Sequence, residues 1–195
     1  MIALIEYGAG NTASVSNALK SIGANFKITS NEQEICQAEK IIFPGVGEAS
    51  SAVKQLHKTN LFNLLRIIKK PLLGICVGMQ LLAEKSEEGN ATCLGVFPTT
   101  SVKFDETKVK VPHMGWNQVK TIKDSLLFRD IKDGEYFYFA NSFYIPKNEY
   151  TVATATHDVE FSAAIQKNNY YGVQFHPEKS GEIGMYLLKN FVELC

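Results

Sequence analysis

The chain has 195 residues, of which 45% are hydrophobic and 21% are charged, and its 20 basic and 20 acidic residues balance to zero net charge. This composition is ordinary for one globular domain spanning residues 1–195, and without a basic excess we expect neither nucleic acid nor a membrane surface as partner. No stretch reaches the length of a membrane span and no basic region precedes the first apolar run, so we expect a cytoplasmic protein.

The first part of the chain alternates predicted strands and helices. Apolar runs predict strands at residues 2–5, 25–28 and 40–43, and helical spacing predicts helices from residue 12 and near residues 49–57 and 61–68. In the first helix, Val15, Leu19 and Ile22 share one face and Gly23 ends the pattern. Strand, helix, strand is the rhythm of an open, mostly parallel α/β sheet with crossover helices.

A glycine-containing turn follows the first predicted strand, at residues 7–11. Gly8 and Gly10 suggest a dinucleotide-binding turn, but Ala13 interrupts the G-x-G-x-x-G pattern and no acidic residue ends the second strand. We therefore expect no nucleotide cofactor there.

Two further glycines, Gly45 and Gly47, follow the third predicted strand. Ligands bind at the carboxyl edge of such sheets, and glycine lets backbone N–H groups turn towards them. An ordinary turn is the alternative. If the next strand carries a nucleophile, we expect an oxyanion hole formed by the N–H of Val46 or Gly47 with that of Val77.

The next strand and helix enclose a cysteine. Residues 72–75 predict a buried strand and residues 78–83 a helix, so Cys76 lies on a sharp turn between Gly74 and Gly78. This is the arrangement of a nucleophile elbow with Cys in place of Ser, and the helix N-terminus would favour the thiolate. A lone cysteine is more often a buried structural residue, so this turn alone leaves both interpretations open.

Beyond Gly89 the pattern becomes strand-rich, and part of this half must be antiparallel or mixed. Short strands are predicted at residues 96–97, 101–104, 109–111, 116–122, 136–139, 152–156, 161–166 and 170–174. A final helix is predicted from residue 184, and its apolar stripe indicates core packing.

One stretch in this half, residues 111–117, does not resemble core. It places the only tryptophan, Trp116, with Met114 and His113 in a turn that contains proline and glycine. Such a turn is either a surface for a partner or a loop packed under the core.

Near the end of the chain, His176 and Glu178 lie just past a predicted strand. Pro177 favours extended backbone at His176, and two side chains two residues apart on extended chain point the same way. A thiol nucleophile needs a base and a third group that orients the base. Together with the turn at Cys76, this pattern predicts a catalytic triad.

Five stretches together resemble the class I (triad-type) glutamine amidotransferases, and more narrowly the glutaminase subunits of imidazole glycerol phosphate synthases. They are residues 7–11, 43–47, 74–82, 111–117 and 172–180. The resemblance implies a flavodoxin-like fold and hydrolysis of glutamine to glutamate and ammonia without a cofactor or metal. Cys76 would form a glutamyl thioester, His176 would carry protons and Glu178 would hold His176. The residues that match substrate-binding positions are Gln80 and the backbone at Gly47, Ser142 and Phe143.

The resemblance also implies a heterodimer. In this family the ammonia passes to a (β/α)8-barrel cyclase subunit, which makes imidazole glycerol phosphate and aminoimidazole carboxamide ribotide in histidine biosynthesis. The residues that match partner-facing positions are Asn11, Trp116 and Lys179.

One residue departs from the family pattern, because Asn141 stands where a histidine is usual. Backbone contacts to glutamine need no particular side chain there, but the departure keeps open a paralogue that supplies ammonia for amination of cell-surface sugars. The same residues also fit a stand-alone thiol γ-glutamyl hydrolase or, with an inactive site, a binding module.

Overall fold

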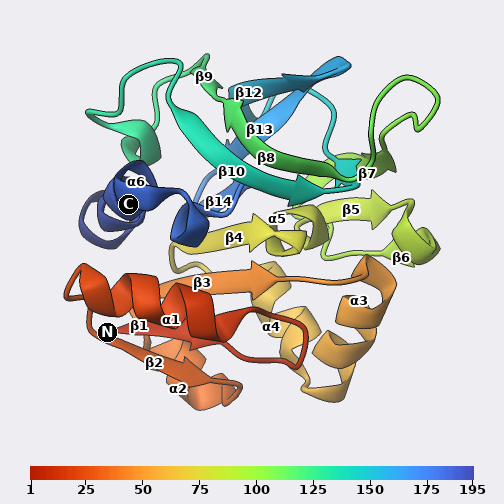
Figure 1. Cartoon of the computed structure of the whole chain (residues 1–195). Coiled ribbons are helices and arrows are strands. Elements are labelled where there is room, and N and C mark those ends of the chain that lie inside the picture. The colour runs from red at the N-terminus through yellow and green to blue at the C-terminus, as the bar shows by residue number, and fades with distance from the viewer.

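An eight-stranded sheet runs through the molecule (Figure 1). The computed structural model describes residues 1–195. The strands of this sheet are β1 (Ile2–Ile5), β2 (Phe26–Thr29), β3 (Lys40–Gly45), β4 (Leu72–Cys76), β9 (Lys120–Thr121), β12 (Thr151–His157), β13 (Val159–Lys167) and β14 (Tyr170–Val173). Their order is β2-β1-β3-β4-β14-β13-β12-β9. Pairing is parallel from β2 to β14 and antiparallel beyond it. The predicted open α/β sheet with a mixed C-terminal half is confirmed.

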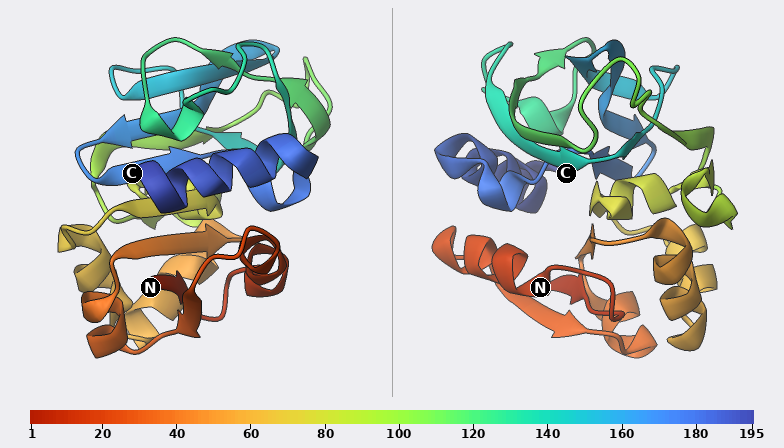
Figure 2. Two further views of the ribbon diagram at one scale, coloured as in Figure 1. Left: turned by 90° about the vertical axis from the view of Figure 1, so that its left-hand side faces the viewer. Right: turned by 45° about the vertical axis from the view of Figure 1, so that its right-hand side comes forward.

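The central strands are apolar throughout because helices cover both of their faces. All residues of β1 and β4 are buried. In the two views of Figure 2, α1 (Thr12–Ser21) and α6 (Gly181–Leu194) lie on one side of the parallel strands, and α3 (Ala49–Lys58) and α4 (Leu61–Ile67) on the other. None of the helices combines the length and the apolar character needed to cross a membrane.

Two smaller groups of strands lie above and to the right of β4 in Figure 1. The strands β8 (His113–Gln118) and β10 (Tyr136–Asn141) form an antiparallel two-stranded ribbon. A four-stranded sheet has the order β11 (Phe143–Tyr144), β7 (Phe97–Lys103), β5 (Ala83–Ser86), β6 (Ala91–Thr92). Phe137 and Phe139 point inward from β10 and pack against Phe175, which anchors the ribbon on the core.

Several element predictions were wrong in this half of the molecule. Residues 109–111 are not a strand, since the carbonyl of Lys110 is bound by Nε2 of His157 (2.9 Å) instead of by a neighbouring strand. The turn predicted at residues 111–117 gives way to strand from His113 onward, three residues before the strand predicted at 116–122, because β8 pairs with β10. The predicted helix at residues 78–83 is the short α5 (Val77–Leu81), and Ala83 already belongs to β5.

One helix was not predicted at all, namely α2 (Glu32–Gln37). It is short and carries one buried residue, Ile35, so it has no apolar periodicity that sequence analysis could detect. Its start is nevertheless well defined, because the side chain of Asn31 accepts a hydrogen bond from the amide of Glu34 (3.1 Å).

Three glycines allow the start of α5 to lie directly against β3 and β4. A Cβ atom on Gly78 would lie 2.0 Å from the carbonyl oxygen of Phe43, and one on Gly74 would lie 2.7 Å from the carbonyl oxygen of Gly78. A Cβ on Gly45 would lie 2.4 Å from the amide nitrogen of Gly78. All three contacts involve backbone atoms, which side-chain rotation cannot relieve. The turn that holds Cys76 therefore requires glycine at these positions.

We expect Gly78→Ala to reduce the free energy of unfolding by about 3 kcal/mol or more, since strand β3 would have to move away from α5. Urea denaturation measures this loss. Gly23→Ala is the control, because a Cβ there meets nothing within 4 Å and only the positive φ of +71° opposes it, a cost of about 1 kcal/mol. Equal losses in the two variants would contradict this account of the turn.

Candidate active site

Cys76 is the last residue of β4 and directly precedes α5. Its backbone has φ 54° and ψ −112°, a conformation that costs energy for any residue other than glycine and is typical of functional sites. The side chain is almost completely buried. Nε2 of Gln174 lies 3.7 Å from Sγ, and the carbonyl oxygen of Ala140 lies 3.9 Å from it. The strand-to-helix turn inferred from the sequence is present, with the sulfur at the carboxyl edge of the sheet.

His176 reaches the same edge because β14 pairs in parallel with β4, with Gly172 opposite Gly74. Its backbone N–H donates to the carbonyl of Tyr138 (2.8 Å), and its ring Nδ1 lies 2.8 Å from Oε1 of Glu178. Both side chains are nearly inaccessible to solvent. This pair leaves Nε2 of the imidazole free to face the thiol.

His176 has the extended backbone that the sequence predicts, with φ −100° and ψ 95°, but the chain that follows it is not extended. Pro177–Lys179 form a 3-10 turn that begins directly after His176. Proline suits the first position of a helical turn because its φ is already near the helical value and it has no N–H to leave unpaired. The contact between His176 and Glu178 was predicted correctly, but for the wrong conformation.

The surroundings of His176 favour its protonated form. Burial lowers its pKa, but hydrogen bonds to Cys76 and Glu178 outweigh burial and raise the pKa from 6.5 to about 10. A positive imidazolium next to a sulfur atom stabilises a thiolate, the form in which cysteine is nucleophilic. The buried pair with Glu178 holds the ring in one orientation.

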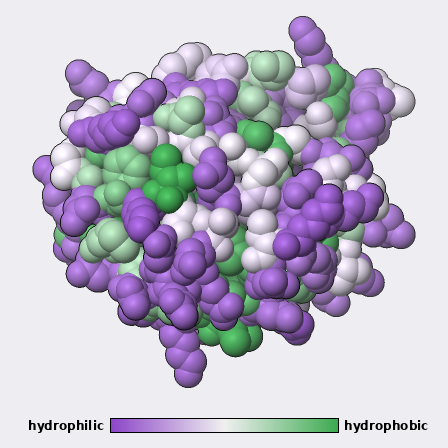
Figure 3. Space-filling view, turned by 90° about the horizontal axis from the view of Figure 1, so that it is seen from below, coloured by the Kyte–Doolittle hydropathy of each residue, from purple (hydrophilic) through white to green (hydrophobic).

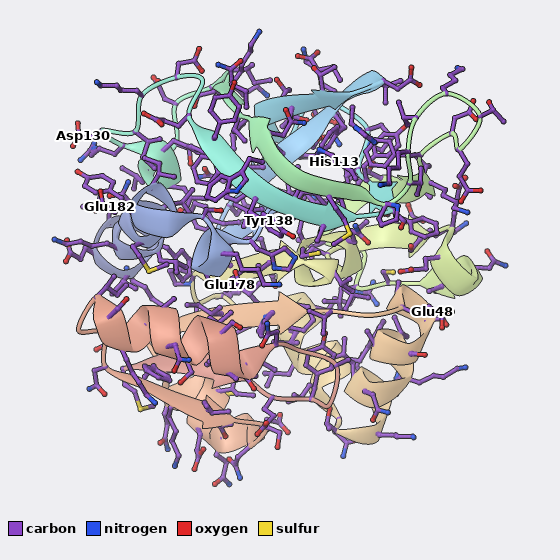
Figure 4. The ribbon with its side chains drawn as sticks, viewed as in Figure 1. Glu48, His113, Asp130, Tyr138, Glu178 and Glu182 are labelled. Carbon is purple, nitrogen blue, oxygen red and sulfur yellow. The ribbon has the colours of Figure 1, made fainter.

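A cavity of about 300 Å³ opens beside the sulfur, large enough for a small molecule. Its lining consists of Val46, Gly47, Cys76, Val77, Gln80, Glu88, Pro112, Ala140, Asn141, Ser142, Phe143, His176 and Lys179. The residues predicted to bind substrate or to form an oxyanion hole all lie in this wall. Glu178 contacts His176 but is not part of the lining. In Figure 4 it lies below Tyr138, on the side of the parallel strands.

The predicted substrate-binding residues are also bonded to one another. Gln80 is buried, and its Nε2 donates to the carbonyl of Phe143 (2.8 Å) and to Oε1 of Gln174 (3.0 Å). Because Gln174 in turn approaches Cys76, one chain of amide groups joins the wall of the cavity to the sulfur.

The predicted oxyanion-hole donors differ in their availability. The N–H of Val46 donates to the carbonyl of Ala9 (3.0 Å), so in this structure it is already engaged. Gly47 has φ +82°, open space around its Cα and no backbone hydrogen bond from its N–H. Val77 is the first residue of α5, where an amide has no partner within the helix. Val77 and Gly47 are thus the better placed donors.

The residues that match partner-facing positions lie on different elements. Trp116 is 56% exposed on the outer side of β8, and Lys179 places its Nζ 5.9 Å above the ring of Tyr138. Asn11 precedes α1 and its side chain accepts a hydrogen bond from the amide of Ser14 (3.3 Å). Only Lys179 of the three lines the cavity.

Sequence reasoning missed Glu88, the one acidic residue in the cavity wall. Its Oε2 accepts the N–H of Ala49 at the start of α3 (2.8 Å), and partial burial raises its pKa. Glu88 lies in a polar turn, where no sequence pattern distinguishes a binding-site carboxylate from a solvent-exposed one.

The structure gathers no cluster of three or more His, Cys, Asp or Glu side chains suited to a metal ion.

Comparison with known sequences extends over the whole chain. The family model "Glutamine amidotransferase class-I" matches residues 3–195. The chain is 45% identical over 195 residues to the "Imidazole glycerol phosphate synthase subunit HisH" of Bacteroides fragilis, with 99% of each chain covered. It is 44% identical over 192 residues to the protein of the same name from Haemophilus influenzae, with 98% of this chain and 96% of the relative covered.

Solved structures resemble the fold at much lower sequence identity. A structure described as a glutamine amidotransferase superposes with a TM-score of 0.74 at 16% identity, covering 98% of this chain and 99% of the other. PurLQS from Thermotoga maritima superposes with a TM-score of 0.70 at 18% identity, covering 97% and 96%. At these identities the likeness is one of fold.

The raised pKa of His176 predicts how stability depends on pH. A group that binds its proton more tightly when folded contributes most below its unfolded pKa, near 6.5, and loses that contribution as the pH rises to about 10. We therefore expect the stability difference between the wild type and His176→Gln, measured by urea denaturation, to fall progressively from pH 6.5 to 10. A difference that stays constant or grows over this range would contradict the assignment.

Proposed function

Because this chain belongs to the class I glutamine amidotransferase family, we propose that it is the glutaminase subunit of an imidazole glycerol phosphate synthase. It hydrolyses glutamine to glutamate and ammonia, which a separate cyclase subunit uses. The observation that carries the proposal is the meeting of Cys76, His176 and Glu178 beside a small cavity. Relatives named as HisH subunits of this synthase, 44–45% identical over nearly the whole chain, support it.

In the proposed reaction, Sγ of Cys76 attacks the side-chain amide carbon of glutamine. His176 delivers a proton to the leaving nitrogen, which departs as ammonia, and a glutamyl thioester remains. His176 then takes a proton from the water that attacks the thioester, and the C–S bond breaks. This releases the γ-carboxylic acid, which ionises to glutamate, and restores the Cys76 thiolate beside the imidazolium. Glu178 holds the imidazole in the required tautomer through its 2.8 Å bond to Nδ1.

The negative oxygen formed by this attack needs N–H donors. We assign Val77 and Gly47 to this role, and Val46 only after its N–H leaves the carbonyl of Ala9. The peptide between Val46 and Gly47 is next to glycine and can rotate at little cost. Losing one oxyanion donor is worth about 3–4 kcal/mol, so the bond from Val46 to Ala9 would keep hydrolysis slow until it is released.

The α-amino end of glutamine carries a positive charge, which needs an acidic partner. Glu88 is the acidic residue in the cavity wall, and its Oε2 is fixed by the N–H of Ala49. We assign Glu88 to the α-ammonium group and the backbone at Ser142 and Phe143 to the α-carboxylate. Ion pairing with hydrogen bonds is the strongest form of such recognition.

The outer face of the β8–β10 ribbon is the proposed docking surface for the cyclase, which we expect to be a (β/α)8 barrel. Met114 is 63% exposed, Trp116 56% and Tyr136 54%, and they point outward from adjacent strands. A cluster of exposed aromatic and Met side chains is typical of protein interfaces. The face seen from below, over the N-terminal half, instead carries small hydrophobic patches scattered among hydrophilic residues (Figure 3).

The central test is Cys76→Ala. We expect glutamine-dependent turnover to fall by at least about 1,000-fold, since the nucleophile is removed, while free ammonia still supports synthesis by the complex. Cys36→Ser, which changes an exposed cysteine, is the control. Near-normal glutamine hydrolysis by Cys76→Ala would refute the proposed nucleophile.

Replacing Glu88 tests the proposed contact to the α-ammonium group. Glu88→Gln should raise the KM for glutamine about tenfold or more, with a smaller change in kcat, because the lost charge acts on binding. Glu48→Gln alters a neighbouring exposed carboxylate that is bonded to Ser50 (2.6 Å) and should leave KM nearly unchanged. The same KM in wild type and Glu88→Gln would remove Glu88 from the binding site.

Coupling to the partner is tested at Trp116. We expect slow hydrolysis by the isolated chain and a rise of at least about tenfold when the cyclase and its ribotide ligand are added. Trp116→Ala should weaken this rise while leaving the basal rate intact. Ile67→Ala is the control, because it truncates another exposed apolar side chain, 71% exposed on α4. It should behave as wild type. Rapid hydrolysis that no cyclase changes would favour a stand-alone hydrolase.

A further inference from the structure

Asn141 is a buried side chain at the end of β10 that also lines the cavity. Its Nδ2 donates to the carbonyl of Phe143 (2.9 Å), the same oxygen that accepts Nε2 of Gln80 (2.8 Å). Two amide donors thus converge on one backbone carbonyl in the cavity wall. A carbonyl held from two directions cannot rotate without breaking both bonds, so the peptide that carries it has one fixed orientation.

The pairing of β11 shows where this peptide points. The N–H of Phe104, in the chain next to β7, donates to the carbonyl of Ser142 (3.1 Å), and Phe143 lies opposite Lys103. Because this bond is made by Ser142, the residue before Phe143, the residues Phe143 and Lys103 form a non-hydrogen-bonded pair of the antiparallel ladder. In such a pair the N–H and C=O of Phe143 both face away from β7. They face the side where Gln80 and Asn141 approach. The N–H of Phe143 shares its peptide plane with the carbonyl of Ser142, which Phe104 holds, whereas Gln80 and Asn141 hold the next peptide plane. With both planes held, φ and ψ of Phe143 are fixed and its N–H and C=O stay on the same side.

The hydrogen bonds of the neighbouring His113 indicate the positions of Oδ1 and Nδ2 in the side-chain amide of Asn141. Asn141 is directly opposite His113 in the ribbon. Nδ2 of Asn117 donates to the carbonyl of Thr156 (2.8 Å) and lies 3.1 Å from Nε2 of His113. Because an amide nitrogen donates, Nε2 of His113 accepts, and the neutral ring carries its proton on Nδ1.

His113 and Asn141, which lie directly opposite each other in the ribbon, each keep one buried polar side-chain atom without a partner. These atoms are Nδ1 of His113 and Oδ1 of Asn141, and neither has a hydrogen-bond partner. Burial, together with the nearby His157, lowers the pKa of His113 to about 4, against the opposing effect of a hydrogen bond to Asn141. The ring is therefore neutral near pH 7, so its Nδ1–H is an unpaired donor on the residue opposite Asn141, whose Oδ1 is an unpaired acceptor. This leaves Nδ2 of Asn141 to point at Phe143.

We propose that Asn141 is a positioning residue for substrate, which acts through Phe143 and is itself held by His113 and Asn117. It keeps the N–H of Phe143 directed into the cavity, where it binds the α-carboxylate of glutamine. The inference rests on the proposed glutaminase function. It assigns to Asn141 an effect on the affinity for ligands that carry an α-carboxylate. It assigns to Asn141 no part in the reaction at Cys76.

The test compares two reagents that alkylate Cys76. A chloromethyl ketone analogue of glutamine carries the α-carboxylate, whereas iodoacetamide does not. In Asn141→Leu, which is nearly isosteric but cannot hydrogen-bond, we expect labelling of Cys76 by the analogue to slow about tenfold or more. Labelling by iodoacetamide should change less than about twofold. In the same variant the KM for glutamine should rise by a similar factor to the loss in labelling rate by the analogue, while kcat changes less.

Asn190→Leu is the matched control. Asn190 is also buried, and its Nδ2 donates to the carbonyls of Leu127 (3.2 Å) and Arg129 (2.7 Å), remote from the cavity. It should lose stability without changing the ratio of the two labelling rates. If Asn141→Leu does not fold, Asn141→Ala removes the same bonds and is expected to shift the ratio in the same direction.

Two outcomes in Asn141→Leu, each compared with the wild type, would overturn the inference. Either both reagents label Cys76 more slowly by the same factor, or the analogue labels it at an unchanged rate. A wild-type chain that neither reacts with the analogue nor hydrolyses glutamine would refute the proposed function itself. A reactive wild type with an unaffected Asn141→Leu would refute only the role of Asn141.

Discussion

The close approach of α5 to β3 and β4 is the constraint on which the site depends. Backbone atoms lie where the Cβ atoms of Gly45, Gly74 and Gly78 would stand, at 2.4, 2.7 and 2.0 Å. Within this packing the chain reverses over one residue, and Cys76 adopts φ 54°. The strain of that conformation is held by the buried strands on either side. A looser turn would leave the sulfur without a fixed position relative to any other group.

The second requirement is topological. His176 and Cys76 are far apart in the chain, yet β14 inserts beside β4 and carries His176 to the same sheet edge. From there the sheet continues antiparallel, and the β8–β10 ribbon packs over it. The ribbon contributes to the site directly, since Tyr138 accepts the N–H of His176 through its carbonyl, and Ala140 faces Cys76. The antiparallel half is therefore a wall of the cavity as well as a support for it.

The ribbon also places an exposed surface and a buried polar network on one strand. Along β8, Met114 and Trp116 point outward, whereas His113 and Asn117 lie on the inner side towards Asn141. Alternation of side chains along a strand makes this arrangement possible. Under the proposed function, a partner that docks on the outer face would press on the strand whose inner residues orient the substrate. The bond from Val46 to Ala9 gives a second, independent point at which such docking could act.

The sequence by itself determined the parallel half of the fold and which residues are candidates for the reactive groups. Apolar runs and helical spacing identified β1, α1, β4 and α6, because local patterns suffice where a strand is buried on both faces or a helix on one. Glycines around Cys76, and a histidine followed by proline and glutamate, are also local signals. The second of these signals is sufficient to predict the contact between His176 and Glu178.

Only the tertiary structure decided the remainder, since it depends on contacts between distant residues. The stretch around Trp116 has turn-forming residues but becomes a strand because β10 pairs with it. Glu88 enters the cavity because the start of α3 binds its carboxylate, and Asn141 gains its partners because His113 lies opposite it. Val46 has its N–H occupied by a carbonyl from the β1–α1 loop, which no pattern within residues 44–47 reveals. A sequence shows which groups are present, but hydrogen bonds across the fold decide which of them are free to act.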